Sequence, residues 1–138
     1  QERGFFGFDK KEDVKYILIS EKGCADPSAE YSLELADGLL PLDIHTFDKD
    51  AFILENEQVH KVTLYTKEKK ACLSLHFHTP VVGLWSPPAK NAPFVCIEPW
   101  YGRCDRAHYT GVYKDKDWMQ HLHPDKTFKG GYTIEIEE

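Results

Sequence analysis

Hydrophobic and polar residues alternate with a period close to two along most of the chain, the pattern of strands that turn one face to a core. This alternation predicts seven short strands, over residues 14–20, 52–55, 59–66, 71–78, 81–85, 93–98 and 132–137. Only the four charged residues KEKK separate the third strand from the fourth, so we expect these two strands to form a hairpin. The pattern therefore predicts an all-β fold, an antiparallel β-sandwich or barrel.

Other segments depart from this alternation. Residues 115–122 are spaced as in a short surface helix that ends before a proline. Residues 25–30 and 86–93 are rich in turn-forming residues and are expected to be turns. The phenylalanines within residues 5–8 have no earlier strand with which to pair, so we expect the chain to start within a fold.

Length and charge narrow the classes of protein. A chain of 138 residues with 41% hydrophobic residues is expected to form a single domain, 1–138, around its own core. A net charge of -6 disfavours nucleic acid and anionic membrane surfaces as partners. The sequence has neither an apolar run near the roughly 20 residues that cross a bilayer nor the apolar core of a signal peptide. We therefore expect a cytoplasmic protein without a cofactor.

The four cysteines, Cys24, Cys72, Cys96 and Cys104, do not form a C-x-x-C pair. This spacing excludes a zinc ribbon and a thioredoxin-like motif. We expect them to be reduced and to serve as small buried hydrophobic residues rather than as reactive thiols.

The segment with the densest chemistry is PFVCIEPWYGRCD, residues 93–105. Its apolar strand delivers the carboxylate of Glu98, and we expect the strand to end there because Pro99 cannot donate to a sheet ladder. Trp100, Arg103 and Asp105 follow. Aromatic rings cover the apolar face of a pyranose, and charged groups bind its hydroxyls. The segment is consistent with a sugar site, and equally with an ion pair between Glu98 and Arg103 beside a core tryptophan.

Two further groups of polar residues are candidates. Asp43, His45, Asp48 and Asp50 cluster in an expected loop before a strand, where ligand-binding residues often lie, although most such aspartates are turn formers. His76 and His78 share one face of their strand and suggest a metal site. No carboxylate follows them at the spacing of a cupin site, so the metal interpretation is the less favoured one and no metal is expected. The remaining histidines, His60, His108, His121 and His123, are interpreted as surface groups.

The sequence resembles a known family in several motifs that occur in the same order. In chain order they are LPL with an acidic loop and DAFI, a hairpin, GLWS, PFVCIEPWYG and YTIEI. These motifs are similar to the carboxy-terminal half of the aldose 1-epimerase (galactose mutarotase-like) family, in its LacX-type branch. This resemblance implies an incomplete portion of a galactose mutarotase-like supersandwich that binds a monosaccharide. It also implies an isomerase of carbohydrate metabolism that interconverts the α and β anomers of a free aldose.

The resemblance also implies roles for particular residues. Glu98 corresponds to the general base, Asp50 to an acceptor for sugar hydroxyls, and Trp100, Arg103 and Asp105 to the lining of the cleft. The family's histidine acid, which lies in an amino-terminal motif before a proline, has no counterpart here. Two readings follow, an epimerase-like enzyme or a non-catalytic carbohydrate-binding module. In either case a homodimer or a complementary amino-terminal half is expected to complete the fold.

Overall fold

The computed structural model describes residues 3–138. Residues 1–2, which belong to the expected domain 1–138, lie outside the described part. The elements over residues 3–138 are the strands β1 (Gly4–Phe8), β2 (Lys15–Ile19), β3 (Ala25–Ser32), β4 (Leu39–Leu42), β5 (Phe52–Leu54), β6 (Lys61–Tyr65), β7 (Ala71–Phe77), β8 (Val81–Trp85), β9 (Cys96–Trp100) and β10 (Tyr132–Ile136), and the single 3₁₀ turns η1 (Glu21–Gly23) and η2 (Tyr113–Asp115).

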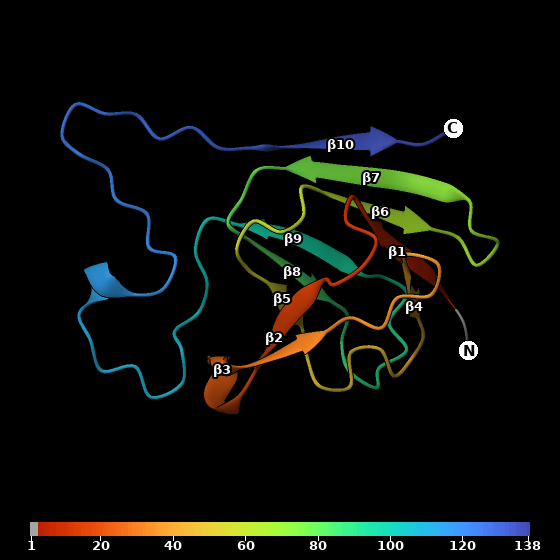
Figure 1. The fold of residues 1–138 in the computed structure, drawn as a ribbon, viewed down its shortest axis with the longest axis horizontal. Coiled ribbons are helices and arrows are strands. Elements are labelled where there is room, and N and C mark those ends of the chain that lie inside the picture. Colours follow the sequence, from red (N-terminus) through yellow and green to blue (C-terminus); the bar gives the residue numbers. More distant parts are fainter. Residues whose placement is uncertain (1–2) are drawn as a thin grey trace.

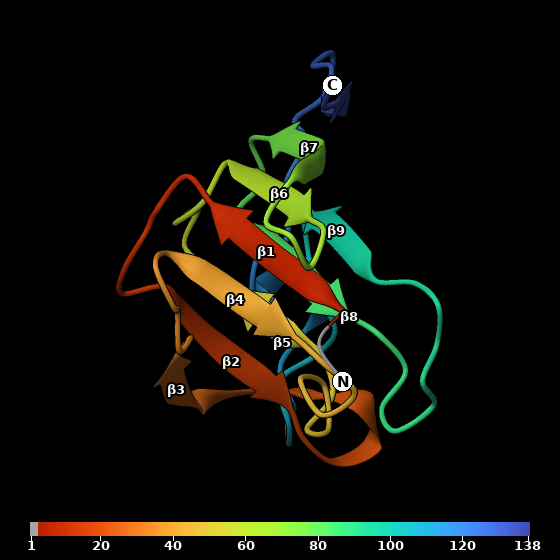
Figure 2. The same ribbon diagram turned by 90° about the vertical axis from the view of Figure 1, so that its right-hand side faces the viewer.

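The strands form two five-stranded antiparallel sheets that pack face to face (Figures 1 and 2). The first sheet has the order β10-β7-β6-β1-β4 and the second the order β3-β2-β5-β8-β9. All paired strands of both sheets run antiparallel. The predicted all-β antiparallel sandwich is therefore confirmed.

The main core fills the space between the two sheets. Phe6 from β1 is fully buried there, and Leu54 and Leu84 from the second sheet are buried beside it. Alternate residues of strands from both sheets supply this core, since successive side chains of a strand point to opposite faces of its sheet. The alternation seen in the sequence is thus the pattern of this interior.

The predicted hairpin is confirmed. β6 and β7 pair antiparallel, with Val62 opposite Leu75. Thr66 closes the charged turn, because its hydroxyl group accepts hydrogen bonds from the backbone N–H groups of Glu68 and Lys70, each at 3.2 Å. A threonine that bonds to the backbone of the following turn in this way stabilises the turn locally.

Three strands were not predicted. β1 pairs with β4, which places Phe6 opposite Leu40, and with β6, so the phenylalanines near the start pair with strands that follow them in the sequence. β3 covers the segment 25–30 that was expected to be a turn. β3 and β4 contain Pro27 and Pro41 and both are edge strands, where the missing N–H group of a proline costs no ladder hydrogen bond.

The same principle corrects the predicted end of β9. This strand continues through Pro99 to Trp100, and Pro99 lies opposite Val82. Because β9 is also an edge strand, its proline interrupts no pairing on the far side. Glu98 consequently lies inside the strand and not at its end.

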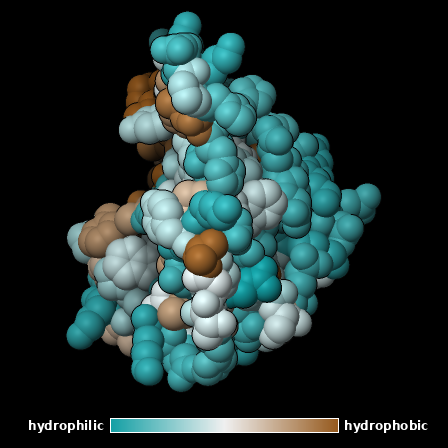
Figure 3. All heavy atoms as spheres, turned by 90° about the vertical axis from the view of Figure 1, so that its left-hand side faces the viewer, coloured by the Kyte–Doolittle hydropathy of each residue, from teal (hydrophilic) through white to brown (hydrophobic). Residues whose placement is uncertain are grey.

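The helix expected over residues 115–122 is not present in the structure. The described chain has only the 3₁₀ turn η2 there, and the residues that follow form turns. This segment belongs to the long connection from β9 to β10 that runs along one side of the sandwich (Figure 1). That side is largely hydrophilic with a few hydrophobic groups (Figure 3). Tertiary contacts of this connection, described below, hold it in a non-helical path.

β10 exposes an apolar face. Tyr132, Ile134 and Ile136 are 62%, 56% and 72% exposed, and they lie opposite Phe77, Leu75 and Leu73 of β7. Directly opposed residues point to the same face of a sheet. The apolar inner face of the first sheet therefore continues onto β10, where no strand of the second sheet covers it.

Two further expectations concern the whole chain. All four cysteines are free, as predicted, but none is fully buried and Cys104 is exposed, so their interpretation as buried core residues is wrong. Among residues 3–138, no helix has the length and apolar character that crossing a membrane requires.

The structure predicts a large loss of stability when the side chain of Phe6, at the centre of the core, is removed. Phe6→Ala is expected to lower the free energy of unfolding by about 3–5 kcal/mol, because Phe6 is fully buried and its loss leaves a cavity. Urea denaturation followed by circular dichroism measures this change. Phe94→Ala is the matched control, since the Phe94 side chain is 49% exposed and should cost less than about 1 kcal/mol. Equal effects of the two substitutions would contradict the assignment of β1 to the core.

Candidate functional site

The candidate site lies on the outer face of the second sheet, the face turned away from the first sheet. The pairing of β5, β8 and β9 places Ile53, Gly83 and Glu98 directly opposite one another, and Ile17 of β2 is opposite Ile53. Because opposed residues share a face, these four residues form one row across the sheet. Glu98 is the single charged residue of the row and occupies its edge position on β9.

Gly83 creates the space beside Glu98. A Cβ atom at position 83 would lie only 2.6 Å from Cζ2 of Trp100, so the indole ring of Trp100 lies directly over the glycine. Trp100 is two residues after Glu98 and therefore shares its face of β9. The site thus combines a half-buried carboxylate with a half-buried indole ring in the neighbouring row.

The rest of this outer face is apolar and partly covered. Ile17, Ala25, Ile53 and Val81 form a second buried cluster, against which the rings of Trp100 and Trp118 pack. Trp118 belongs to the long connection between β9 and β10. This connection consequently covers the apolar part of the face and leaves Glu98 at its border.

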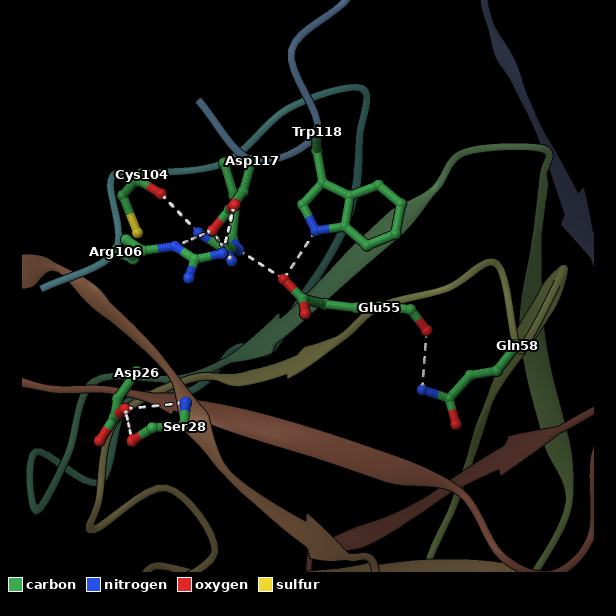
Figure 4. Close-up of polar contacts among 9 residues, drawn as sticks. Asp26, Ser28, Glu55, Gln58, Cys104, Arg106, Asp117 and Trp118 are labelled. Atoms are coloured by element: carbon green, nitrogen blue, oxygen red, sulfur yellow. Dashed lines mark hydrogen bonds and ion pairs between the residues drawn. The ribbon is translucent and has the colours of Figure 1, made fainter. Parts of the chain in front are cut away.

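An ion-pair network holds the connection in place (Figure 4). The guanidinium group of Arg103, whose side chain is 1% exposed, donates from Nε to Glu55 Oε1 at 2.5 Å and from a terminal nitrogen to Asp117 Oδ2 at 2.7 Å. The indole Nε1 of Trp118 donates to the same Glu55 oxygen at 2.8 Å. Because Glu55 directly follows β5, the network fixes the connection to the middle strand of the second sheet.

The electrostatics of this network favour the charged forms of its members. The guanidinium group of Arg106 donates two hydrogen bonds to Asp117, at 2.8 and 2.5 Å. These bonds are the largest cause of the lowered pKa of Asp117, and the hydrogen bond from Arg103 adds to them, while burial acts in the opposite direction. The pKa of Arg106 is raised by the same pairing. Asp117 is therefore held as a carboxylate between two arginines.

The position of Arg103 settles one alternative that the sequence left open. Arg103 pairs with Glu55 and Asp117, and the ion pairs found within residues 3–138 do not include Glu98. The interpretation of Glu98 as the ion-pair partner of Arg103 is therefore wrong. Cys96 is a further neighbour of Glu98 on the same face, and the pKa of its thiol is raised first by burial and then by the negative charge of Glu98.

Asp50 lies just before the amino-terminal end of β5, whereas Glu55 follows the carboxy-terminal end of that strand. It directly precedes Ala51 and has a left-handed backbone conformation, with φ of 74°, and its carboxylate accepts a hydrogen bond from the N–H group of Ala51 at 2.7 Å. Asp50 lies three residues before Ile53, and two strand spacings of roughly 5 Å each separate Ile53 from Glu98. The two carboxylates are therefore not in contact, and a ligand that touches both must span the face between them.

Asp105 has a different position. Its carboxylate pairs with the ammonium group of Lys116, and its backbone carbonyl accepts a hydrogen bond from Ala25 at 2.8 Å. Asp105 thus holds the long connection against β3. Glu55, Asp117 and Gly83, which organise the site, were not singled out in the sequence, since only the tertiary pairing gives them these positions.

His76, His45 and His108 have partners other than Glu98. His76 lies on the outer face of the first sheet, where its Nε2 is 2.8 Å from Glu135 of β10. This face is on the opposite side of the sandwich from Glu98. His45 pairs with Asp48 at 2.9 Å in the exposed loop before β5. His108, as predicted, is an exposed surface group, paired with Glu21 at 3.0 Å.

Comparisons with known proteins place this geometry in context. No family model matches the chain. The chain is 32% identical, over 98 residues, to the plasmid protein LacX of Lactococcus lactis subsp. lactis, a match that covers 70% of this chain and 32% of LacX. The chromosomal LacX of the same organism matches to the same extent.

Two solved structures share the fold. A galactose mutarotase related enzyme from Lactobacillus acidophilus aligns with 97% of this chain and 45% of its own, with a TM-score of 0.81 and 29% identity. A galactose mutarotase-like protein from Lactobacillus casei ATCC 334 aligns with 98% of this chain and 46% of its own, with a TM-score of 0.77. At 20% identity, the second likeness shows the fold alone.

Fold and sequence together show that the chain has a galactose mutarotase-like β-sandwich fold. Within that class it is related to the LacX-type branch, as the motifs predicted. The chain spans about a third of the length of the curated relatives and less than half of the solved ones.

Breaking the buried ion-pair network should lower the stability of the fold, whereas breaking an exposed ion pair should not. Glu55→Gln is expected to lower the free energy of unfolding by about 1.5–3 kcal/mol, because the buried Arg103 loses a charged hydrogen-bond partner. Thermal or urea unfolding measures the change. Glu68→Gln is the control, since its exposed pair with Lys67, at 3.9 Å, should contribute nothing measurable. Unchanged stability of Glu55→Gln would show that the network does not hold the connection.

Proposed function

We propose that the chain is the base-bearing part of an aldose 1-epimerase-like protein that interconverts the α and β anomers of a free aldose. The observation that carries this proposal is the carboxylate of Glu98, free of any ion pair within residues 3–138 and next to the indole ring of Trp100 over Gly83. The relationship to LacX and to a galactose mutarotase related enzyme supports it.

The proposed reaction needs one base and one acid. Glu98 takes the proton of the anomeric hydroxyl group while an acid protonates the ring oxygen, so the bond between C1 and the ring oxygen breaks and an open aldehyde forms. Rotation about the bond between C1 and C2 followed by closure, with both protons returned, gives the other anomer. A single positioned acid or base contributes about 10²–10⁴-fold to such a reaction.

The proposed sugar lies on the outer face of the second sheet between Glu98 and Asp50. The indole ring of Trp100 offers an apolar surface to the C–H face of a pyranose, and the Asp50 carboxylate accepts hydrogen bonds from its hydroxyl groups. Arg103 is a positioning residue and not a ligand contact, because its side chain is 1% exposed. Asp105 belongs to the same supporting group through its pair with Lys116.

The acid of this reaction comes from outside the immediate surroundings of Glu98. His76 is on the opposite side of the sandwich and is paired with Glu135. We therefore propose that a complementary amino-terminal half supplies the acid. The second candidate function, a non-catalytic carbohydrate-binding module, is favoured by this same separation of His76 from Glu98. A cytoplasmic location and a single domain over 1–138 are part of the same proposal.

The test of this function is an anomerisation assay. NMR of freshly dissolved α-D-glucose and α-D-galactose follows conversion to the β anomer with the wild-type chain, Glu98→Gln and Glu30→Gln. Glu98→Gln is expected to lose 10²–10⁴-fold of any rate enhancement and to retain sugar binding, since the amide keeps the shape of the side chain without its basicity. Glu30, exposed on β3, provides the matched control and should leave the rate unchanged.

The outcomes separate the two candidate functions. An enhancement that survives in Glu98→Gln would exclude Glu98 as the base. Saturable sugar binding without enhancement in the wild type would favour the binding module. Absence of both binding and enhancement would contradict both proposals.

The exposed face of β10 supports a partner for this chain. Tyr132, Ile134 and Ile136 continue the apolar interior face of the first sheet and are more than half exposed. Apolar surface of this kind is stabilised when another element removes it from water. We propose that a complementary β-rich half covers this face, and that a second copy of the chain covers it when the other half is absent.

This partner proposal predicts concentration-dependent self-association. Sedimentation equilibrium of the wild-type chain should give a dimer that Ile134→Lys converts to a monomer, because a lysine in the contact places a charge in an apolar interface. Thr133→Lys is the control, since Thr133 points to the opposite face of β10. A monomeric wild type at all concentrations, or equal effects of the two lysines, would contradict the proposed interface.

A further inference from the structure

A second cluster of side chains lies away from Glu98, where two chain connections meet. The connection from β5 to β6 carries Glu57 and His60, and the connection from β7 to β8 carries His78. The N–H group of Glu57 donates to the carbonyl oxygen of Pro80 at 3.0 Å, and the N–H group of Phe77 donates to that of His60 at 2.9 Å. These bonds fix the two connections side by side.

The side chains of this cluster are arranged as potential metal ligands. One ligand atom each from Glu57, His60 and His78 lie within 4.8 Å of one another. The imidazole rings of His60 and His78 have their centroids 4.9 Å apart. The interpretation of His60 as a simple surface group is therefore wrong, since its side chain is half-buried and its ring packs at a tilt against a second imidazole.

His60 also has an unsatisfied polar atom. Its Nδ1 is buried and has no hydrogen-bond partner among the residues that the structure describes. Burying a polar atom without a partner costs free energy, so buried polar groups in proteins are normally paired. A cation bound to this nitrogen would supply the partner.

We propose that Glu57, His60 and His78 bind a transition-metal ion, with Zn²⁺ as the preferred one. Two imidazoles and one carboxylate form a three-residue ligand set known from zinc sites that keep a fourth position open. Imidazole ligands favour zinc over Mg²⁺ and Ca²⁺, which prefer oxygen ligands alone. A tetrahedral zinc ion places its ligand atoms about 3.4 Å apart. Binding therefore draws the exposed side chains of Glu57 and His78 inwards by a change of rotamer.

The charges around the cluster are nearly balanced. Asp9 accepts hydrogen bonds from the N–H group of His60 at both carboxylate oxygens, each at 3.1 Å, and lines the same hollow as the two histidines. Lys61 and Lys129 line that hollow as well. The carboxylates of Glu57 and Asp9 attract a cation and the two ammonium groups repel it, so the imidazole nitrogens supply the specific part of the affinity.

The site differs from the histidine pair that the sequence suggested. His76 of β7 lines the hollow together with His78, which lies just beyond the end of that strand. The Nε2 of His76 contacts Glu135 at 2.8 Å, and His76 is not part of the cluster. A zinc ion at the cluster links two connections that are distant in sequence. Because it binds the folded chain, it stabilises that chain by mass action, independently of any reaction at Glu98.

The experiment titrates the full chain, freed of metal by a chelator, with ZnCl₂ in a calorimeter and with CoCl₂ in a spectrophotometer. One saturable zinc site per chain and a raised melting temperature are expected for the wild type. His78→Gln and Glu57→Gln should each bind zinc at least about tenfold more weakly and lose the shift in melting temperature. His76→Gln is the matched control and should behave as the wild type. Circular dichroism of each variant checks that the fold is retained.

Other outcomes would overturn the proposal. No saturable zinc binding by the wild type, or equal weakening by His76→Gln and His78→Gln, would exclude the cluster as the site. Zinc could instead bind the free cysteines Cys24 and Cys104, which lie near each other: burial raises the pKa of the Cys104 thiol and the neighbouring Cys24 adds to that rise. A sulfur-to-cobalt charge-transfer absorption that persists in His78→Gln would identify that alternative.

Discussion

The pairing of β8 with β5 on one side and with β9 on the other is the constraint on which the candidate site depends. It aligns Ile53, Gly83 and Glu98 in one row. Since strand side chains alternate between faces, a shift of one residue in this register would turn Glu98 into the core. Gly83 adds a second requirement, because the indole ring of Trp100 occupies the space that any side chain at position 83 would need.

The ion-pair network around Arg103 performs a supporting role for this face. It fixes the connection between β9 and β10 to the end of β5 through Glu55, and it holds Trp118 over the outer apolar cluster. Breaking a buried pair of this kind leaves an uncompensated charge, which is why such residues affect the fold more than exposed pairs do. The residues that the sequence suggested as the lining of a sugar cleft therefore divide into two groups. Glu98 and Trp100 are at the surface of the candidate site, and Arg103 lies beneath it.

The alternation of hydrophobic and polar residues predicted much of the fold, and the strands that it missed have physical reasons. β1 is buried on both faces, so its sequence GFFGF shows no alternation. β3 and β4 are edge strands, and an edge strand tolerates the prolines that elsewhere indicate a turn. The expected helix over residues 115–122 does not form in a segment where Asp117 and Trp118 contact Arg103 and Glu55. Glu98 was predicted as a site residue from its motif, whereas its separation from Arg103 and the approach of His60 to His78 arise from pairings between segments that are distant in sequence.

The central claim is that the outer face of the second sheet binds a monosaccharide beside Glu98. The most direct measurement is an NMR titration of the ¹⁵N-labelled chain with D-glucose and D-galactose, following the indole N–H signals of Trp85, Trp100 and Trp118. The structure predicts a saturable shift of the Trp100 signal and a smaller one for Trp118, whose indole nitrogen is already bonded to Glu55. Indole signals that do not move at any sugar concentration, or shifts confined to the amides of β10, would contradict the claim.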